Sequence, residues 1–362
     1  MAAPLDAGWL WQALARGESL DARPDPRRAV LHRFAGLVSP ALAASLLPGP
    51  DWDGLIGADA LRQSRLLARF THRNQRAALA TIAQGGFECV VLKGFANAHL
   101  LYPEPEARIV GDLDLLVRPG DLAGLVAYLG AAGYRFRGAP PRLWGFISDA
   151  SFLPFVAADG GCNLDLHVEP DCYPLYCGLG AAALFGAARP MEIDGLRILV
   201  PAAEHVLALC LSNAVKDKLG VFALRKALDA LMLLRAPHDL DWDAIEAVLG
   251  AGRLTGPGRA FFALLESLGL APGIVPPRLA RPPRGLAALE FRQVEAEWRA
   301  LFPREPGLTS LLRREALLCA EPGIALYNHW LRLKGLVAPG SGLPEAARGL
   351  AGLEPPAGES RD

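Results

Sequence analysis

The stretch GDLDLLV, residues 111–117, alternates acidic and apolar side chains, which predicts a β-strand. A spacing of two residues on a strand places the carboxylates of Asp112 and Asp114 on one face, about 6 to 7 Å apart. Both can then reach one cation, and Mg²⁺ prefers oxygen ligands. The stretch therefore indicates a metal site of the kind that clamps a transferring phosphoryl group. Paired aspartates at a strand edge are also common as solvated loop acids, so the stretch by itself leaves both interpretations open.

A third acid stands in a second alternating stretch, NLDLH, residues 163–167. If this strand lies beside the first, Asp165 completes the shell of a metal held by Asp112 and Asp114, or accepts the proton of an attacking hydroxyl. His167 shares the face of Asp165, because side chains two positions apart on a strand point the same way. It either orients Asp165 or contacts substrate, and the alternative is a hydrogen-bonded histidine at the end of a strand.

A strand, a glycine turn and a helix are expected upstream of the acids. Residues 87–92 (FECVVL) form a compact apolar run typical of a buried strand, and a helical stretch covers residues 95–101. Between them, Gly94 lets the backbone approach a phosphate, the next helix offers free N–H groups, and Lys93 adds a positive charge. A Lys-Gly pair is also common in plain turns, so its position one helix before the acidic strand gives it its weight.

The pattern on either side of these stretches predicts an α+β fold. A long amphipathic helix is expected over residues 58–84, a helix over 120–132, hairpins over 152–168 and 191–199, and helices from 201 onward. The predicted division of the chain is an N-terminal helical extension (1–54), a catalytic domain on a small mixed β-sheet (55–200), a C-terminal helical domain (201–336) and a loosely ordered tail (337–362).

Composition excludes several classes of protein. The chain has 362 residues, 21% charged residues and a net charge of −1, so no basic excess favours a long nucleic-acid partner. Six scattered cysteines without a CxxC pair match no zinc site and are expected to be reduced thiols. Residues 1–20 resemble neither a signal peptide nor a membrane anchor, and the longest uncharged run, 172–188, is too short to span a bilayer. A cytoplasmic protein is expected.

Taken together, the stretch LKGFANAHLLYPEPEARIVGDLDLLVRP (92–119), the following helix, Gly133-Tyr134 and the later LDLH (164–167) resemble the uncharacterised bacterial nucleotidyltransferase family of the DNA polymerase beta-like superfamily. The resemblance covers roughly residues 66–235. It implies a polymerase beta-like fold in which Gly94 lies at the phosphate turn, Asp112 and Asp114 bind metal, and Asp165 is the third acid.

The resemblance extends to other side chains. Arg108 matches an arginine before the acidic pair, which is expected to meet a phosphate or fix the loop; the alternative is a surface arginine. Phe95 stands where a serine is usual, so a hydroxyl contact to the triphosphate is missing and catalysis is in doubt. Cations of the helical part are expected to close over the triphosphate, unless they are solvated helix charges. The predicted nucleotide-binding residues are Lys93, Gly94, Arg108, Gly111 and Lys216, with Lys218, Arg225 and His167 as secondary residues.

The function that these expectations support is transfer of NMP from an NTP, such as ATP, to a hydroxyl of a small molecule, sugar or peptide, with Mg²⁺ or Mn²⁺ and release of pyrophosphate. Two alternatives are a catalytically weak nucleotide-binding regulatory module and an antitoxin-type protein nucleotidyltransferase. Trp144 and Phe146 either stack on a base or cover a sheet edge. The sequence specifies neither the acceptor, the base nor the oligomeric state.

Overall fold

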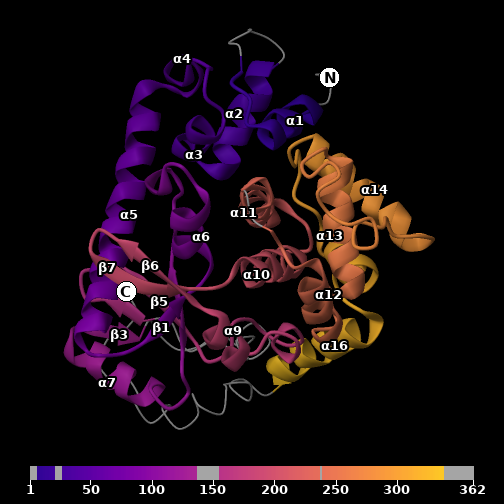
Figure 1. The fold of residues 1–362 in the computed structure, drawn as a ribbon. Coiled ribbons are helices and arrows are strands. Elements are labelled where there is room, and N and C mark those ends of the chain that lie inside the picture. Colours follow the sequence, from indigo (N-terminus) through magenta and orange to yellow (C-terminus); the bar gives the residue numbers. More distant parts are fainter. Residues whose placement is uncertain (1–5, 21–26, 137–154, 237–238, 338–362) are drawn as a thin grey trace.

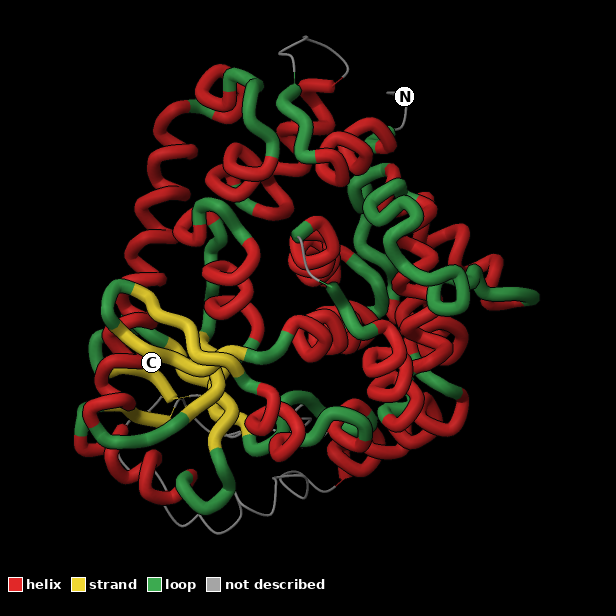
Figure 2. Tube along the Cα trace, in the orientation of Figure 1, coloured by secondary structure: helices red, strands yellow, loops and turns green. Residues whose placement is uncertain are grey.

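The computed structural model of the chain describes residues 6–20, 27–136, 155–236 and 239–337. Trp144, Phe146 and nearly all of the expected tail therefore lie outside the described residues. Figures 1 and 2 show the strands gathered in one part of the molecule and helices around them.

The strands form one mixed sheet of seven, in the order β3-β4-β5-β2-β1-β7-β6. Pairing is parallel between β2 and β5 and between β1 and β7, and antiparallel elsewhere. The predicted α+β class with a small mixed sheet is confirmed. The strands are β1 (Cys89–Val91), β2 (Leu113–Val117), β3 (Tyr134–Phe136), β4 (Phe155–Ala157), β5 (Asn163–His167), β6 (Arg189–Ile193) and β7 (Leu196–Val200).

Two details of the strand prediction were wrong. Strand β2 begins at Leu113, so Asp112 stands just before the strand. The short strand β3 pairs with β4 at the edge of the sheet and was not expected. The predicted hairpin at residues 191–199 is confirmed by the pairing of β6 with β7.

The central strand β2 is buried on both faces, which explains its run of apolar residues. Leu113, Leu115 and Val117 belong to a cluster with apolar side chains of helices α5 (Ala58–Gln84) and α7 (Leu122–Ala131). Leu116 points the other way, into a larger cluster with residues of α9 (Ala181–Ala187) and α10 (Ala203–Lys216). Asp114 shares that second face, so its carboxylate faces the helical part of the chain.

Helices account for most of the remaining described chain (Figure 1), and the bounds of α5 match the prediction to the residue. The other helices are α1 (Gly8–Arg16), α2 (Arg27–Val38), α3 (Pro40–Leu46), α4 (Trp52–Ile56), α6 (Lys93–Leu101), α11 (Leu224–Arg235), α12 (Trp242–Ala251), α13 (Thr255–Ser267), α14 (Leu286–Arg299), α15 (Leu308–Arg314), a π-helical turn (Glu315–Cys319) and α16 (Pro322–Val337).

The N-terminal helices pack against the far end of the chain. The Trp11 ring lies 6.0 Å from the ring of Trp298 in α14, and the Ala7 amide donates to the Arg299 carbonyl at 2.7 Å. The larger apolar cluster includes residues of α1–α3, of β1 and of α10–α14. The predicted N-terminal, catalytic and helical regions thus share one buried core, and their division into domains stays a prediction.

Within the described residues, no single helix combines the length and apolar character needed to cross a membrane. Helices α2 and α3 would reach that length and composition only as a pair, and they are bent by 119° at their junction.

Candidate active site

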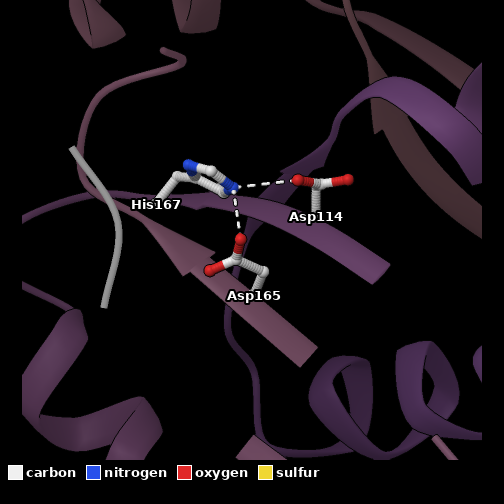
Figure 3. Close-up of side chains that lie close together, drawn as sticks. All are labelled: Asp114, Asp165 and His167. Atoms are coloured by element: carbon white, nitrogen blue, oxygen red, sulfur yellow. Dashed lines mark hydrogen bonds and ion pairs between the residues drawn. The ribbon is translucent and has the colours of Figure 1, made fainter. Parts of the chain in front are cut away.

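Strands β2 and β5 bring two of the three predicted acids side by side. The strands are parallel, and their register sets Asp114 opposite Asp165 and Leu116 opposite His167. One ligand atom from each of Asp114, Asp165 and His167 lies within 4.8 Å of the others. The His167 Nε2 atom is 3.0 Å from Asp114 Oδ1 and 3.4 Å from Asp165 Oδ2, as Figure 3 shows.

This group has the donors that a hard divalent cation needs. Two carboxylates and one imidazole converge, and Asp165 Oδ1 is buried without a hydrogen-bond partner among the described residues. A buried carboxylate oxygen without a hydrogen bond destabilises the folded protein, and coordination of a cation would compensate for the missing hydrogen bond. The residues present therefore fit a metal ion. The predicted set is altered in one respect, because His167 belongs to the tight group and Asp112 does not.

Lys93 lies against the same carboxylate. Its Nζ atom donates to Asp114 Oδ1 at 3.1 Å, and its backbone is in the left-handed region, with φ at 50°. Burial alone raises the pKa of Asp114, but the charge of Lys93 and the hydrogen bond from His167 outweigh it and hold that pKa well below its usual range. Lys93 and His167 therefore favour the ionised form of Asp114, and Lys93 compensates the charge that burial would otherwise penalise.

Asp112 stands at the mouth of this group. The residue is exposed, but partial burial of its carboxyl and the negative charges of Asp114 and Asp165 raise its pKa. The charges of the three acids therefore influence one another. Only Asp114 and Asp165, however, lie close enough to each other and to His167 to bind one metal ion together. A positive charge entering this region would lower the pKa of Asp112 again.

A cavity of about 290 Å³ opens over the acids, between the sheet and the helical part. Its floor is formed by the sheet side and its opposite wall by α10 and α11. Arg225 of α11 is exposed there and has no ion-pair or hydrogen-bond partner among the described residues. The lining residues with charged or phosphate-approaching groups are Lys93, Gly94, Arg108, Gly111, Asp112, Asp114, Asp165, Arg225, Lys226 and Asp229.

The comparison with protein families agrees with this geometry. The model of the family described as "Uncharacterised nucleotidyltransferase" matches residues 37–268, which contain the whole sheet and both walls of the cavity. The chain belongs to this nucleotidyltransferase family. No curated protein matches the sequence.

In this nucleotidyltransferase the turn at Gly94 is closely packed. A Cβ atom added there would lie 2.8 Å from Val110 Cγ1, which no side chain tolerates without a shift of its neighbours. The next residue, Phe95, is buried against His99 and His72, with ring centroids 4.6 and 5.4 Å away. The side chain of Phe95, where the resemblance led us to expect serine, thus points into the protein, and a phosphate at this turn would meet backbone N–H groups.

Arg108 is held in a buried ion pair. Its Nε and Nη2 atoms donate to the two oxygens of Asp229 at 2.9 and 2.7 Å, and its Nη1 atom donates to the Gly94 carbonyl at 3.1 Å. Asn97 and Tyr102 donate to the same carboxylate at 2.9 and 2.7 Å. These are the contacts of an arginine that fixes the loop, and they connect the turn at Gly94 to α11.

Two of the predicted phosphate-closing cations lie elsewhere. Lys216 donates to Asp171 Oδ1 at 2.6 Å, and Lys218 lies 3.4 Å from Glu315 Oε2. Neither lines the cavity over Asp114; both line a second cavity. Of the three cations, Arg225 alone lines the cavity over the acids, so the structure separates residues that the sequence grouped.

Two buried acids that pair with predicted site cations were not predicted from the sequence: Asp171, which holds Lys216, and Asp229, which holds Arg108. Asp171 is buried and accepts hydrogen bonds from Ser212, Asn213 and Lys216, and their effect lowers its pKa although burial opposes it. Asp229 is a lone acid among the apolar residues of α11. An acid among apolar helix residues could have predicted this pair, because a buried carboxylate requires a charged or hydrogen-bonding partner.

Proposed function

We propose that the protein transfers NMP from an NTP to a hydroxyl of a small molecule, sugar or peptide, with Mg²⁺ or Mn²⁺ held by Asp112, Asp114 and Asp165. The observation that carries the proposal is the register of β2 and β5, which puts Asp114 beside Asp165 at the floor of a cavity. The unpartnered Asp165 Oδ1 supports a cation at this point. His167 is an additional candidate ligand.

Other residues of the chain bind the phosphates and accept the proton of the acceptor hydroxyl. The turn at Gly94 and the start of α6 present backbone N–H groups to the phosphates, with Lys93, Gly111 and Arg225 around them. A bound divalent cation supplies charge neutralisation at the phosphates. The acceptor oxygen forms a bond to the α-phosphorus, the bond to the bridging oxygen breaks, and pyrophosphate leaves. Asp165 takes the proton of the acceptor hydroxyl.

The test is pyrophosphate release from each NTP with Mg²⁺ or Mn²⁺, in the wild type and in the Asp112→Ala and Asp114→Ala variants. Each variant is expected to lose at least about 100-fold in rate, because a group that stabilises transition-state charge is typically worth several kcal/mol. The matched control is Asp59→Ala, which removes an exposed acid of α5. Full turnover in both active-site variants would contradict the proposal.

A second candidate is a nucleotide-binding regulatory module with little catalysis. Two observations favour it. Lys93 and His167 both lie within 3.1 Å of a single oxygen of Asp114, which they would have to share with a bound metal ion. The side chain of Phe95 also contributes nothing to the cavity. Tight NTP binding without pyrophosphate release, with any acceptor, would select the module over the enzyme.

A further inference from the structure

The segment that leads into the acidic strand lies outside any regular element. Residues 109–112 belong to no helix or strand, and β2 begins at Leu113. Asp112 is therefore carried by irregular backbone, whereas Asp114 is fixed opposite Asp165 by the pairing of β2 with β5. The position of the Asp112 carboxylate thus depends on the contacts that hold this segment.

Helix α5, the longest of the described helices, supplies hydrogen-bond donors to this segment (Figure 1). Gln75 Nε2 donates to the Val110 carbonyl at 3.4 Å and to the Asp112 carbonyl at 3.2 Å. About one turn earlier in the helix, His72 Nε2 donates to the Arg108 carbonyl at 2.9 Å. The three carbonyls belong to alternate residues, which face one side of an extended backbone. The helix therefore lies along the segment and holds it through these carbonyls.

Gln75 is an unusual residue for the buried face of a helix. Its side chain is 1% exposed, and its Oε1 atom has no hydrogen-bond partner among the described residues. The amide is held in one orientation, because an exchange of its nitrogen and oxygen would set its oxygen against two carbonyl oxygens. Burial of an unpaired acceptor largely offsets the stabilisation that two neutral hydrogen bonds provide. Stabilisation of the fold therefore does not account for a glutamine at this position.

The carboxylate of Asp112 follows its own backbone. Burial and the charges of Asp114 and Asp165 raise the pKa of Asp112, and a hydrogen bond from the Asp112 backbone N–H opposes this rise. The carboxylate is thus tied to the residue whose carbonyl Gln75 holds. A shift of this backbone would move the carboxylate relative to the other two acids, with which it lines the cavity.

The residue before Gln75 holds the second acidic strand. Asn74 Nδ2 donates to the Gly161 carbonyl at 2.9 Å, and Gly161 stands just before β5, which carries Asp165. A Cβ atom added at Gly161 would lie 2.8 Å from Asn74 Nδ2, so the helix and this turn are in close contact. Consecutive residues of α5 therefore contact the two segments that lead to the acids.

We propose that Gln75 is a positioning residue for the metal site, which fixes the Asp112 backbone so that the Asp112 carboxylate joins Asp114 and Asp165 at a divalent cation. The inference rests on the proposed metal-dependent transfer. Gln75 is not among the described residues that line the cavity, so it acts through Asp112 and touches neither the nucleotide nor the cation. Its loss weakens cation binding and leaves the chemical step to the acids.

The binding test is a titration with Mn²⁺ in the absence of nucleotide, with free Mn²⁺ measured by its EPR signal. Gln75→Met keeps the length of the side chain and removes both donors, and it is expected to raise the Kd for Mn²⁺ about 10-fold or more, as loss of a residue that orients a metal ligand typically does. Gln75→Asn is one methylene shorter and does not reach both carbonyls, so a smaller loss in the same direction is expected. This milder variant provides the test if Gln75→Met does not fold.

Two further variants calibrate the titration. Leu79→Ala, at a buried apolar residue of α5 one turn further along, destabilises the helix packing without removing a donor from the segment, and it should leave the Kd for Mn²⁺ unchanged. Asp114→Ala should abolish tight binding. With NTP present, Gln75→Met should raise the Mg²⁺ concentration for half-maximal pyrophosphate release about 10-fold or more, with the rate at saturating Mg²⁺ unchanged.

The outcomes separate this inference from the function beneath it. Unchanged Mn²⁺ affinity in both Gln75 variants, or an equal loss in Leu79→Ala, overturns the positioning role, while pyrophosphate release that depends on Asp114 leaves the transferase standing. Mn²⁺ binding that requires both Asp114 and Gln75, without release from any NTP, overturns the transferase and retains the positioning role. Mn²⁺ binding that is independent of Asp114 overturns the metal site and the positioning role with it.

Discussion

Replacement of Asp229 by asparagine should destabilise the protein more than any surface change. Asp229 is 2% exposed, and its carboxylate accepts four hydrogen bonds, from Asn97, Tyr102 and twice from Arg108. An amide offers one acceptor oxygen and one donor group, so at least one of these donors would face an N–H. The Arg108 charge, itself 7% exposed, would lose its counter-charge.

Breaking a buried ion pair from one side typically costs about 3 to 5 kcal/mol. We expect Asp229→Asn to lose an amount in this range from the free energy of unfolding, measured by urea denaturation. Asp59→Ala removes one member of an ion pair whose side chains are 71% and 79% exposed, and it should cost less than about 1 kcal/mol. The effect should also reach the active site, because Arg108 donates to the Gly94 carbonyl, so NTP affinity should fall.

A double-mutant cycle separates the pair from its surroundings. Arg108→Met with Asp229→Asn should cost less than the sum of the two single changes, since the second change removes a group that the first has already left unpaired. Additive costs, or a loss below about 1 kcal/mol in Asp229→Asn, would refute the account of this network.

Three further outcomes are expected. Gly94→Ala should lower the free energy of unfolding by about 1 to 3 kcal/mol and weaken NTP binding, because the added Cβ would lie 2.8 Å from Val110 Cγ1. Unchanged stability and NTP affinity would contradict this packing. Lys216 and its neighbours lower the pKa of Asp171 in the folded protein, so the ionised carboxylate stabilises the fold above the unfolded pKa of about 3.9. The difference in free energy of unfolding between the wild type and Asp171→Asn should therefore shrink as the pH falls below that value. A difference that stays constant from pH 5 to 3 would contradict the ion pair. Mg²⁺ should raise the melting temperature of the wild type and not of Asp114→Ala, and an equal rise in both would place the cation elsewhere.

The local patterns of the sequence were enough to predict the elements that form the site. The bounds of α5 follow from its helical apolar spacing and the glycines at its ends, and the alternation in 111–117 and 163–167 predicted strands with acids on one face. Strand β3 could not be predicted in this way, because three residues at a sheet edge are too few to show a period.

Local sequence patterns could not predict contacts between residues that are far apart in the chain. Arg108 and Asp229 are 121 residues apart, and only the packing of α6 against α11 makes them neighbours. The two faces of α10 are polar at Asn213 and at Lys216 alike, so its pattern does not tell which face borders the acids. Lys93, which donates to Asp114, has a left-handed backbone conformation that no periodic pattern of residues predicts.

The central claim is that Asp114 and Asp165 share a divalent cation with a bound nucleotide. A crystal grown with Mn²⁺ and a non-hydrolysable NTP would test it by anomalous scattering. The account predicts a manganese peak within about 2.5 Å of an oxygen from each of these two acids, with Lys93 moved from Asp114 to the phosphates. A nucleotide bound in the cavity with no manganese at the acids, and Lys93 still donating to Asp114, would contradict it.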